Sequence, residues 1–265
     1  MGQNGGMSSQ QPFPASSPDP ATGTDQQLQY SESLTGNRGE TPEEVLRHRK
    51  KDVRTLWRAR RRELDPADRA EQSDALTRRV LEWYLPRAQH RRAAAVMSYG
   101  SEPDTGPLRT ALHGAGVEVL VPVTEPERHL SWTAWHPGVE MARSPVAPID
   151  EPVGERHGVD TFATVDLVLV PAQAVDSRGI RLGQGGGYYD RFLAGLDRLP
   201  RRQPEDPLTA APDAGPAGSA APLTVAMVFR HELLTHGQVP SDEHDRPVDG
   251  VVTADGFVWF GPEPA

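Results

Sequence analysis

The residues best suited to chemistry in this chain form a glycine-rich segment between an apolar run and an expected helix. Segment 181–191 reads RLGQGGGYYDR and follows the run LVLVP at 167–171. Four glycines in the five positions before Tyr188 leave backbone N–H groups free to converge on an anion at a helix N-terminus. Tyr188 and Tyr189 supply aromatic faces, Asp190 can hold a metal ion, and an arginine flanks each end. The combination predicts a site for a polyanion, a divalent cation and an aromatic heterocycle.

The glycine-rich segment does not follow the common phosphate-binding motifs. No Lys-Ser/Thr pair follows the glycines, as a Walker A loop requires, and their spacing is not G-x-G-x-x-G. A tight strand-to-helix turn that needs glycine for packing alone is the alternative interpretation. Such a turn does not require Tyr188, Tyr189 or Asp190, so a binding role is favoured.

A second candidate is a basic ridge on a helix expected over 43–64. Lys50, Arg54 and Arg58 recur at i, i+4 and i+8, so they lie on one side of that helix and can reach phosphates. A charge run beside an apolar stripe is more often a solvated face. A nucleic-acid-binding module that uses the basic helix 50–62 stays an alternative, although the formal net charge of −9 disfavours it.

Two clusters of acidic residues are further candidates for a site. Glu102 and Asp104 come after a strand expected to end at Tyr99, and the cluster 242–245 (DEHD) follows Pro240. Each alone is more often a polar loop than a metal site. Ser98 and Ser101 lack a base and an orienting group at motif spacing, so nucleophilic catalysis is not indicated.

The elements that must position these residues alternate between helices and strands. Periodicity predicts helices over 43–64, 65–84, 105–113 and 187–196, strands over 93–99, 117–123, 130–135, 166–172 and 223–229, and a hairpin over 251–260. This alternation predicts an α/β fold, with three α/β/α layers around a mostly parallel, Rossmann-like central sheet. Ligands bind such sheets beyond the carboxyl ends of the strands, where the glycine-rich segment falls.

Composition divides the chain of 265 residues into one domain and two low-complexity segments. Residues 1–40 are predicted to be a disordered tail, and a flexible Pro/Ala/Gly-rich insertion is expected at 200–222 within a single domain over 41–265. The chain has no cysteine, no signal-peptide pattern and no apolar run near the roughly 20 residues that span a bilayer. We expect a cytoplasmic monomer with a small-molecule substrate and no nucleic-acid or membrane partner.

The glycine-rich segment and its surroundings resemble the signature of 5-formyltetrahydrofolate cyclo-ligases, also called 5,10-methenyltetrahydrofolate synthetases. The signature reads LVPA from Leu169, then Asp176, Gly179 and RLGQGGGYYD. Weaker landmarks fall in the family's order over roughly 45–258: Lys50-x-x-x-Arg54 with Arg58, Gln72-Ser73, 98–105 with Glu102, Glu151-Pro152, Pro240, His244-Asp245 and Val248-Asp249. The resemblance implies an enzyme that uses ATP and Mg²⁺ to convert 5-formyltetrahydrofolate into 5,10-methenyltetrahydrofolate, releasing ADP and phosphate. A related α/β enzyme acting on another small phosphorylated substrate is the alternative.

The same resemblance implies roles for individual residues, with no nucleophile or base among them. The implied ATP-binding residues are Lys50, Arg54, Arg58, Arg181, Leu182, Gly183, Gln184, Gly185, Gly186, Gly187, Tyr188 and Tyr189. The implied folate-binding residues are Glu102, Gly185, Gly186, Gly187, Tyr188 and Tyr189, and Asp190 and Asp245 would carry Mg²⁺. One position departs from the family, because Gln184 stands where arginine is common and one positive charge near the phosphates is missing.

Overall fold

The computed structural model describes residues 40–199 and 221–264. The predicted tail over 1–40 and the insertion over 200–222 lie outside the described residues, apart from Glu40, Ala221 and Pro222. The chain divides into two units, Met1–Val45 and Leu46–Ala265, and the sheet, core and site described below belong to the second. Within the described part, no helix combines the length and apolarity needed to cross a bilayer.

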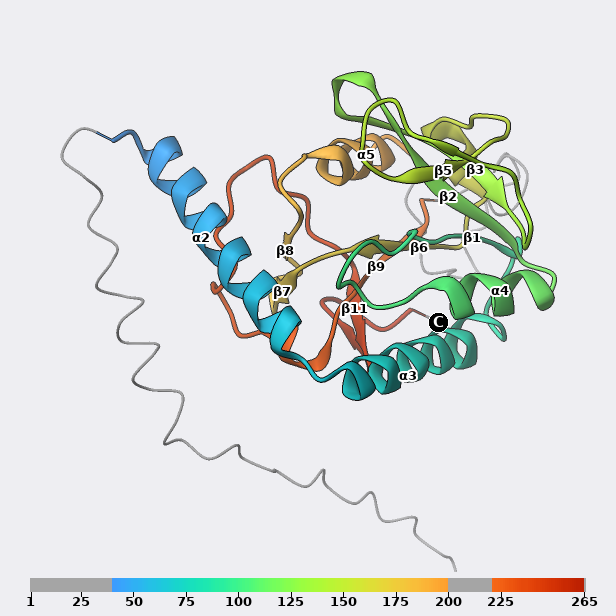
Figure 1. The fold of residues 1–265 in the computed structure, drawn as a ribbon, viewed down its shortest axis with the longest axis horizontal. Helices are drawn as coiled ribbons and strands as arrows, with labels where there is room; N and C mark the ends of the chain where they lie inside the picture. The colour runs from blue at the N-terminus through green and yellow to red at the C-terminus, as the bar shows by residue number, and fades with distance from the viewer. Residues whose placement is uncertain (1–39, 200–220, 265) are drawn as a thin grey trace, which may run out of the picture. The chain divides into compact units, whose positions relative to one another are not determined.

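A seven-stranded sheet forms the centre of this unit (Figure 1). From edge to edge its strands are β12 (Gly256–Trp259), β11 (Gly250–Thr253), β9 (Leu223–Met227), β6 (Leu167–Pro171), β1 (Arg92–Ala94), β2 (Glu118–Glu125) and β3 (His129–Trp135). The five inner strands pair in parallel, and only the edge strands β12 and β3 are antiparallel to their neighbours. The predicted mostly parallel sheet is therefore confirmed.

Helices cover both faces of the sheet, which confirms the three predicted layers. Helices α3 (Pro66–Tyr84) and α4 (Gly106–Gly114) lie on one face and α5 (Tyr188–Leu196) on the other (Figure 1). Successive side chains of β6 point to opposite faces of the sheet, as in any strand, and so pack against different helical layers. Leu167 and Leu169 pack in the cluster with α3 and α4, whereas Val168 and Val170 pack in the cluster with α5. Because both faces are covered, β6 is apolar along its whole length.

Local sequence explains where the helices begin. Asp65 caps α3, accepting hydrogen bonds from the N–H groups of Ala67 (2.8 Å) and Asp68 (3.4 Å), and Pro66 occupies the first turn as predicted. Helix α5 begins after Gly187, whose φ of 73° places it in the left-handed region. Glycine adopts that conformation without steric cost, so the chain turns sharply from the glycine-rich segment into the helix.

The structure departs from the predicted elements mainly after β1. This strand ends at Ala94, whereas the sequence predicts a strand over 93–99, because side-chain hydrogen bonds hold the following residues as a loop. The Thr105 hydroxyl donates to the carbonyl of Val96 (2.7 Å) and contacts the Ser98 hydroxyl (2.8 Å). Short strands were not predicted: β4 (Met141–Arg143), β5 (Asp150–Pro152), β7 (Ala174–Asp176), β8 (Arg181–Leu182) and β10 (Leu233–Leu234) form two small sheets. Strands of two or three residues are too short to show a period.

Helix α2 (Pro42–Glu63) is fixed by a buried ion pair near its C-terminal end. Arg61 and Glu232 are 1% and 0% exposed, and Arg61 Nη2 lies 2.9 Å from Glu232 Oε2. The same carboxylate accepts a hydrogen bond from the N–H of Phe229, and Arg61 also donates to the carbonyl of Ala172. Trp57 packs in a small apolar cluster beside this pair. These contacts set the orientation of α2 around its own axis.

Removal of the Glu232 carboxylate should destabilise the protein strongly, because it leaves the Arg61 guanidinium buried without a counter-charge. We expect Glu232→Ala to lower the free energy of unfolding by about 3–5 kcal/mol. Glu118→Ala is the matched control: Glu118 pairs with Arg92, but its side chain is 43% exposed, so its loss should cost less than about 1 kcal/mol. Urea unfolding followed by circular dichroism measures both values, and equal losses would contradict the role given to Arg61.

Candidate active site

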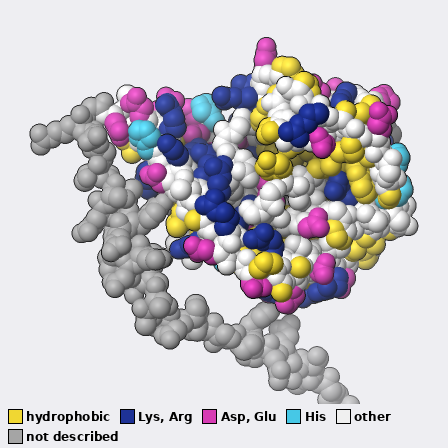
Figure 2. Space-filling view, viewed as in Figure 1, with side chains coloured by type: hydrophobic (Ala, Val, Ile, Leu, Met, Phe, Trp, Pro, Cys, Tyr) yellow, Lys and Arg dark blue, Asp and Glu magenta, His cyan; other side chains and the backbone are white. Residues whose placement is uncertain are grey.

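A cavity of about 820 Å³ opens at the carboxyl ends of the parallel strands. Its walls include Pro171 at the end of β6, Val96 and Met97 after β1, residues of α2 and α5, and the whole segment 183–191. In Figure 2 a band of Lys and Arg side chains runs beside a hollow, and hydrophobic side chains lie along the opposite wall. The cavity thus lies where the sequence predicts a ligand site.

The predicted basic ridge of α2 faces the glycine-rich segment. Arg54 Nε donates to the carbonyl of Gly183 (2.9 Å), and Arg58 Nη2 donates to the carbonyl of Gln184 (3.2 Å). Lys50 and Arg54 line the cavity, whereas Arg58 contacts the segment without lining it. The ridge is therefore not solely a solvated face, because Arg54 and Arg58 donate to carbonyls of the glycine-rich segment, although Arg58 itself is exposed.

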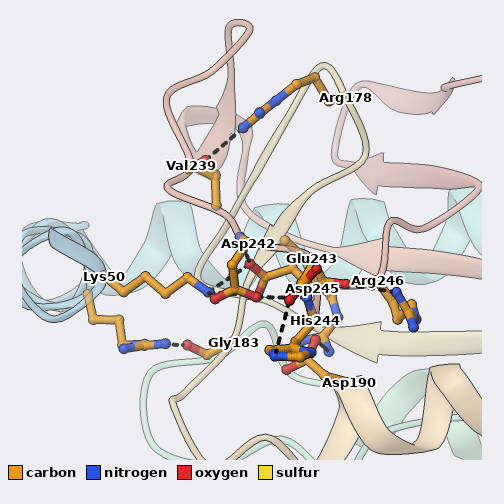
Figure 3. A network of polar contacts seen from close by, with 12 residues as sticks. Lys50, Arg178, Gly183, Asp190, Val239, Asp242, Glu243, His244, Asp245 and Arg246 are labelled. Carbon is orange, nitrogen blue, oxygen red and sulfur yellow. Dashed lines mark hydrogen bonds and ion pairs between the residues drawn. The ribbon is translucent and has the colours of Figure 1, made fainter. Parts of the chain in front are cut away.

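Lys50 forms an ion pair with the acidic loop that the sequence singled out. Its Nζ lies 2.7 Å from Asp245 and 2.9 Å from Asp242 (Figure 3). Burial opposes the charge on Lys50, but the hydrogen bonds and charges of Asp245 and Asp242 outweigh that effect and raise the pKa of Lys50 above its ordinary value. The residues just before this loop are held by Arg178. Its guanidinium donates to the carboxylate of buried Asp176 (2.6 Å) and to the carbonyl of Val239 (2.7 Å).

The second predicted metal ligand, Asp190, pairs with Arg181. Arg181 Nη2 lies 2.7 Å from Asp190 Oδ1, and the Arg181 side chain is 3% exposed. Burial is the largest influence on Arg54 and lowers its pKa. The charges of Asp245 and Asp190 act in the opposite direction, so both carboxylates lie close enough to Arg54 to affect its pKa. Both also line the cavity. The structure thus brings Lys50, Arg54, Arg181, Asp190 and Asp245 together.

Glycine at position 185 lets Arg54 cross the segment. Gly185 has a φ of 102°, and a Cβ added there would lie 3.3 Å from Arg54 Cζ. A Cβ added at Gly186 would lie only 2.8 Å from a ring carbon of Tyr188, which folds back over the segment. Gly185 therefore favours glycine for its backbone conformation and for the close approach of Arg54, and Gly186 for the close approach of Tyr188 alone.

The two tyrosines differ in their surroundings. Tyr189 is enclosed by Trp132 and Phe192, with the Arg181 guanidinium 5.7 Å from its ring centre. Its hydroxyl is buried and has no hydrogen-bond partner among residues 40–199 and 221–264. Burial raises the pKa of Tyr189 far above its ordinary value. The hydroxyl therefore keeps its proton and can donate a hydrogen bond to a ligand. Both Tyr188 and Tyr189 line the cavity.

Glu102 is joined to the glycine-rich segment by Gln184. The Gln184 amide nitrogen donates to Glu102 Oε1 (3.0 Å), and its oxygen accepts from Gln173 (2.6 Å) and Arg58 (3.1 Å). The residue that departs from the resembled signature is therefore the centre of a hydrogen-bond network. An arginine at this position has no acceptor, so it would lose both accepted bonds.

Several lining residues were given no role by the sequence. Glu151, which is 5% exposed, accepts hydrogen bonds from the N–H (2.7 Å) and hydroxyl (2.5 Å) of Thr124, and both residues line the cavity. Arg128 and Arg191 line it as well. The sequence marks Glu151 only as part of the Glu151-Pro152 landmark, without a role, and Arg128 lies in a turn where no local pattern marks it.

Comparisons with known proteins agree with the resemblance. The model of the 5-formyltetrahydrofolate cyclo-ligase family matches residues 46–254. The 5-formyltetrahydrofolate cyclo-ligase of Escherichia coli strain K12 is 29% identical over 206 residues, which cover 77% of this chain and 99% of that protein. The enzyme of the same name from Mycolicibacterium smegmatis is 29% identical over 210 residues, covering 77% and 93%.

The fold is likewise similar to a solved structure. The NMR structure of Aquifex aeolicus 5,10-methenyltetrahydrofolate synthetase superposes with a TM-score of 0.61 at 23% identity, covering 82% of this chain and 95% of that one. At this identity the likeness supports the fold alone. The family model, in contrast, spans the basic helix, the glycine-rich segment and the acidic loop. The chain therefore belongs to the 5-formyltetrahydrofolate cyclo-ligase family.

Proposed function

We propose that this chain converts 5-formyltetrahydrofolate and ATP into 5,10-methenyltetrahydrofolate, ADP and phosphate. The observation that carries the proposal is the meeting of the α2 ridge and the glycine-rich segment at one cavity. Cations and two carboxylates gather at one part of that cavity, while apolar side chains, including Met97, Leu130 and Ile149, line other walls. A nucleotide's phosphates and a flat heterocycle are the ligands that such walls suit.

The chemistry explains why no nucleophilic side chain is needed. The oxygen of an N-formyl group is a poor leaving group, so the reaction begins when that oxygen attacks the γ-phosphorus of ATP and ADP departs. The neighbouring folate amine then attacks the activated formyl carbon and loses its proton, and phosphate leaves with the former formyl oxygen. Phosphoryl transfer depends on positioning and on neutralisation of charge.

Lys50, Arg54 and Arg181 would hold the phosphates together with the backbone N–H groups of 183–187. Arg181 fits an anion because its Nε is buried and has no partner in the part of the chain that the structure describes. Lys50 and Arg181 are each neutralised by a carboxylate before any ligand binds. Incoming phosphates would therefore compete with Asp245 and Asp190 for these cations.

Asp190 and Asp245 fit Mg²⁺, the ion that the family's use of ATP implies. Among the described residues no group of three or more carboxylates and imidazoles could cage an ion. Mg²⁺ does not need such a cage, since it keeps several waters and is held by one or two carboxylates plus phosphate oxygens. When bound, the ion supplies further neutralisation of the phosphate charge.

Glu102, Tyr188 and Tyr189 would orient the folate. One oxygen of Glu102 is held by Gln184, and the other accepts from the N–H of Tyr99 (3.0 Å), so the carboxylate has a fixed direction. A carboxylate fixed in this way can accept hydrogen bonds from the amino and amide N–H groups of the pterin. The unpartnered Tyr189 hydroxyl would donate to the same ligand.

Turnover should depend on ATP with equal yields of the products. We expect one ADP and one phosphate for each methenyl product, the latter followed by its near-ultraviolet absorbance. Folate conversion without ATP consumption would contradict the proposal and would favour a different reaction of the same fold.

Replacement of Asp190 should remove most of the catalytic activity while the protein still folds. We expect Asp190→Asn to lower kcat by at least about 100-fold at saturating Mg²⁺, since charge neutralisation at phosphates is the main source of rate. The protein should stay folded but with a lowered thermal unfolding midpoint, because the amide oxygen can still accept a hydrogen bond from Arg181 whereas that buried guanidinium loses its counter-charge. Near-normal turnover would remove Asp190 from the site.

Lys50 and its neighbour Lys51 offer a matched pair of charge deletions on one helix. Lys50→Met should raise the KM for ATP by about 10-fold or more, because a charge-assisted hydrogen bond to phosphate is lost. Lys51→Met removes the same charge from an exposed position and should leave the KM for ATP within about 2-fold. Steady-state kinetics with varied ATP tests both, and equal effects would mean that only net charge matters.

A further inference from the structure

Two arginines line the cavity apart from the residues assigned to the phosphates. Arg128 lies in the turn between β2 and β3, and Arg191 lies in the first turn of α5. In the part of the chain that the structure describes, neither guanidinium forms an ion pair with a carboxylate. Lys50 and Arg181, by contrast, each have a carboxylate within 2.7 Å. Arg128 and Arg191 are therefore uncompensated cations on a ligand cavity.

The turn that carries Arg128 is strained and tied to α5. Glu127 and Arg128 have φ values of 57° and 64°, in a region that residues other than glycine rarely adopt. Arg191 Nη1 donates to the carbonyl of Glu127 (2.7 Å), which holds the turn against the helix. Such conformations persist only where surrounding contacts over-determine them, and they concentrate at ligand sites.

Glu125 of β2 and Asp150 of β5, two carboxylates of neighbouring strands, have other partners. Glu125 Oε1 accepts from the Ser131 hydroxyl (2.5 Å) and lies 4.0 Å from Arg156. Asp150 lies 3.4 Å from Arg143. The positive charge of Arg128 and Arg191 on the cavity wall is thus available to a ligand.

Asp190 and Arg191 at the start of α5 have partners in different segments of the cavity wall. Successive helical residues point about 100° apart, because the helix has 3.6 residues per turn. Asp190 accordingly contacts Arg181, which is proposed to hold phosphate, whereas Arg191 contacts the β2–β3 turn. Leu130, two residues after Arg128, also lines the cavity and offers an apolar surface beside the cations.

We infer that Arg128 and Arg191 form a carboxylate-binding subsite for the glutamyl end of the folate substrate. The inference rests on the proposed function, since it assigns a site to the anionic end of an elongated substrate whose ring would lie at Glu102. Guanidinium groups match carboxylates in shape and can bind them through two parallel hydrogen bonds. Both arginines are exposed, so the subsite is open to solvent and leaves room for a tail that continues outward.

The test compares two substrates that differ only at this end. 5-Formyltetrahydrofolate carries the glutamyl carboxylates, and 5-formyltetrahydropteroate has the same ring and linker without them. Arg128→Ala should raise the KM for the folate by about 5- to 20-fold, the effect of losing a hydrogen bond to a charged group, with kcat unchanged. The KM for the pteroate should stay within about 2-fold of the wild-type value, because the deleted group has no carboxylate to bind.

Further variants separate recognition from structure. Arg128→Lys keeps the charge and should restore part of the affinity, whereas Arg191→Ala should act like Arg128→Ala and also release the Glu127 carbonyl. Arg79→Ala, on exposed α3 surface, is the control and should affect neither substrate. An unchanged KM for the folate in Arg128→Ala, or an equal rise for both substrates, would overturn the inference.

The two compounds can also be compared by their Kd values, which calorimetry measures without any turnover. A wild-type chain that binds both compounds without converting either would contradict the proposed function. The ratio of the two Kd values in wild type and Arg128→Ala would still decide whether the arginines bind the carboxylates. A ratio that falls toward one in the variant supports the subsite, and an unchanged ratio overturns it.

Discussion

The buried pairing of Arg61 with Glu232 is the constraint on which the site depends. Helix α2 is rich in charge and has few buried apolar residues, so its rotation must be fixed by something other than a broad hydrophobic face. Arg58, Arg54 and Lys50 precede Arg61 by three, seven and eleven residues, which are multiples of the helical period and lie on one stripe. A guanidinium that can be buried only against Glu232 and the Ala172 carbonyl therefore directs the stripe toward the glycine-rich segment.

The site is organised around cations whose charge is already balanced. Asp245 neutralises Lys50 and Asp190 neutralises Arg181. This arrangement avoids buried unpaired charge in the ligand-free protein, which would be costly. It also keeps two carboxylates within the cavity, where the phosphates of a nucleotide would release them for a divalent ion. In the proposed function, the same groups would stabilise the ligand-free protein and neutralise charge when the nucleotide is bound.

The parts of this account that rest on local pattern could be predicted from the sequence. The run LVLVP forms the central strand β6, Asp65 caps α3, and the glycine-rich segment lies at the carboxyl edge of the sheet. The i, i+4, i+8 spacing of Lys50, Arg54 and Arg58 likewise predicted that these residues lie on one side of the helix. Each of these features depends on residues that are neighbours in the sequence or along one helix.

The features that could not be predicted depend on contacts between distant segments. Glu232 lies 171 residues from Arg61, so nothing near either residue marks the pair as buried. From the sequence, Gln184 was interpreted as the loss of one positive charge. In the structure its amide links Glu102 to Arg58, and the Arg58 guanidinium brings a positive charge to the same segment. The end of β1 at Ala94 is set by hydroxyl contacts of Thr105, which an apolar pattern over 93–99 does not reveal.

The fate of the formyl oxygen tests the central claim most directly. The substrate is prepared with ¹⁸O in the formyl group, and the products are analysed by mass spectrometry after one turnover with ATP. If the oxygen attacks the γ-phosphorus and leaves with it, the label will be found in inorganic phosphate. Label in water, with unlabelled phosphate, would mean that the formyl oxygen is never phosphorylated and would contradict the mechanism.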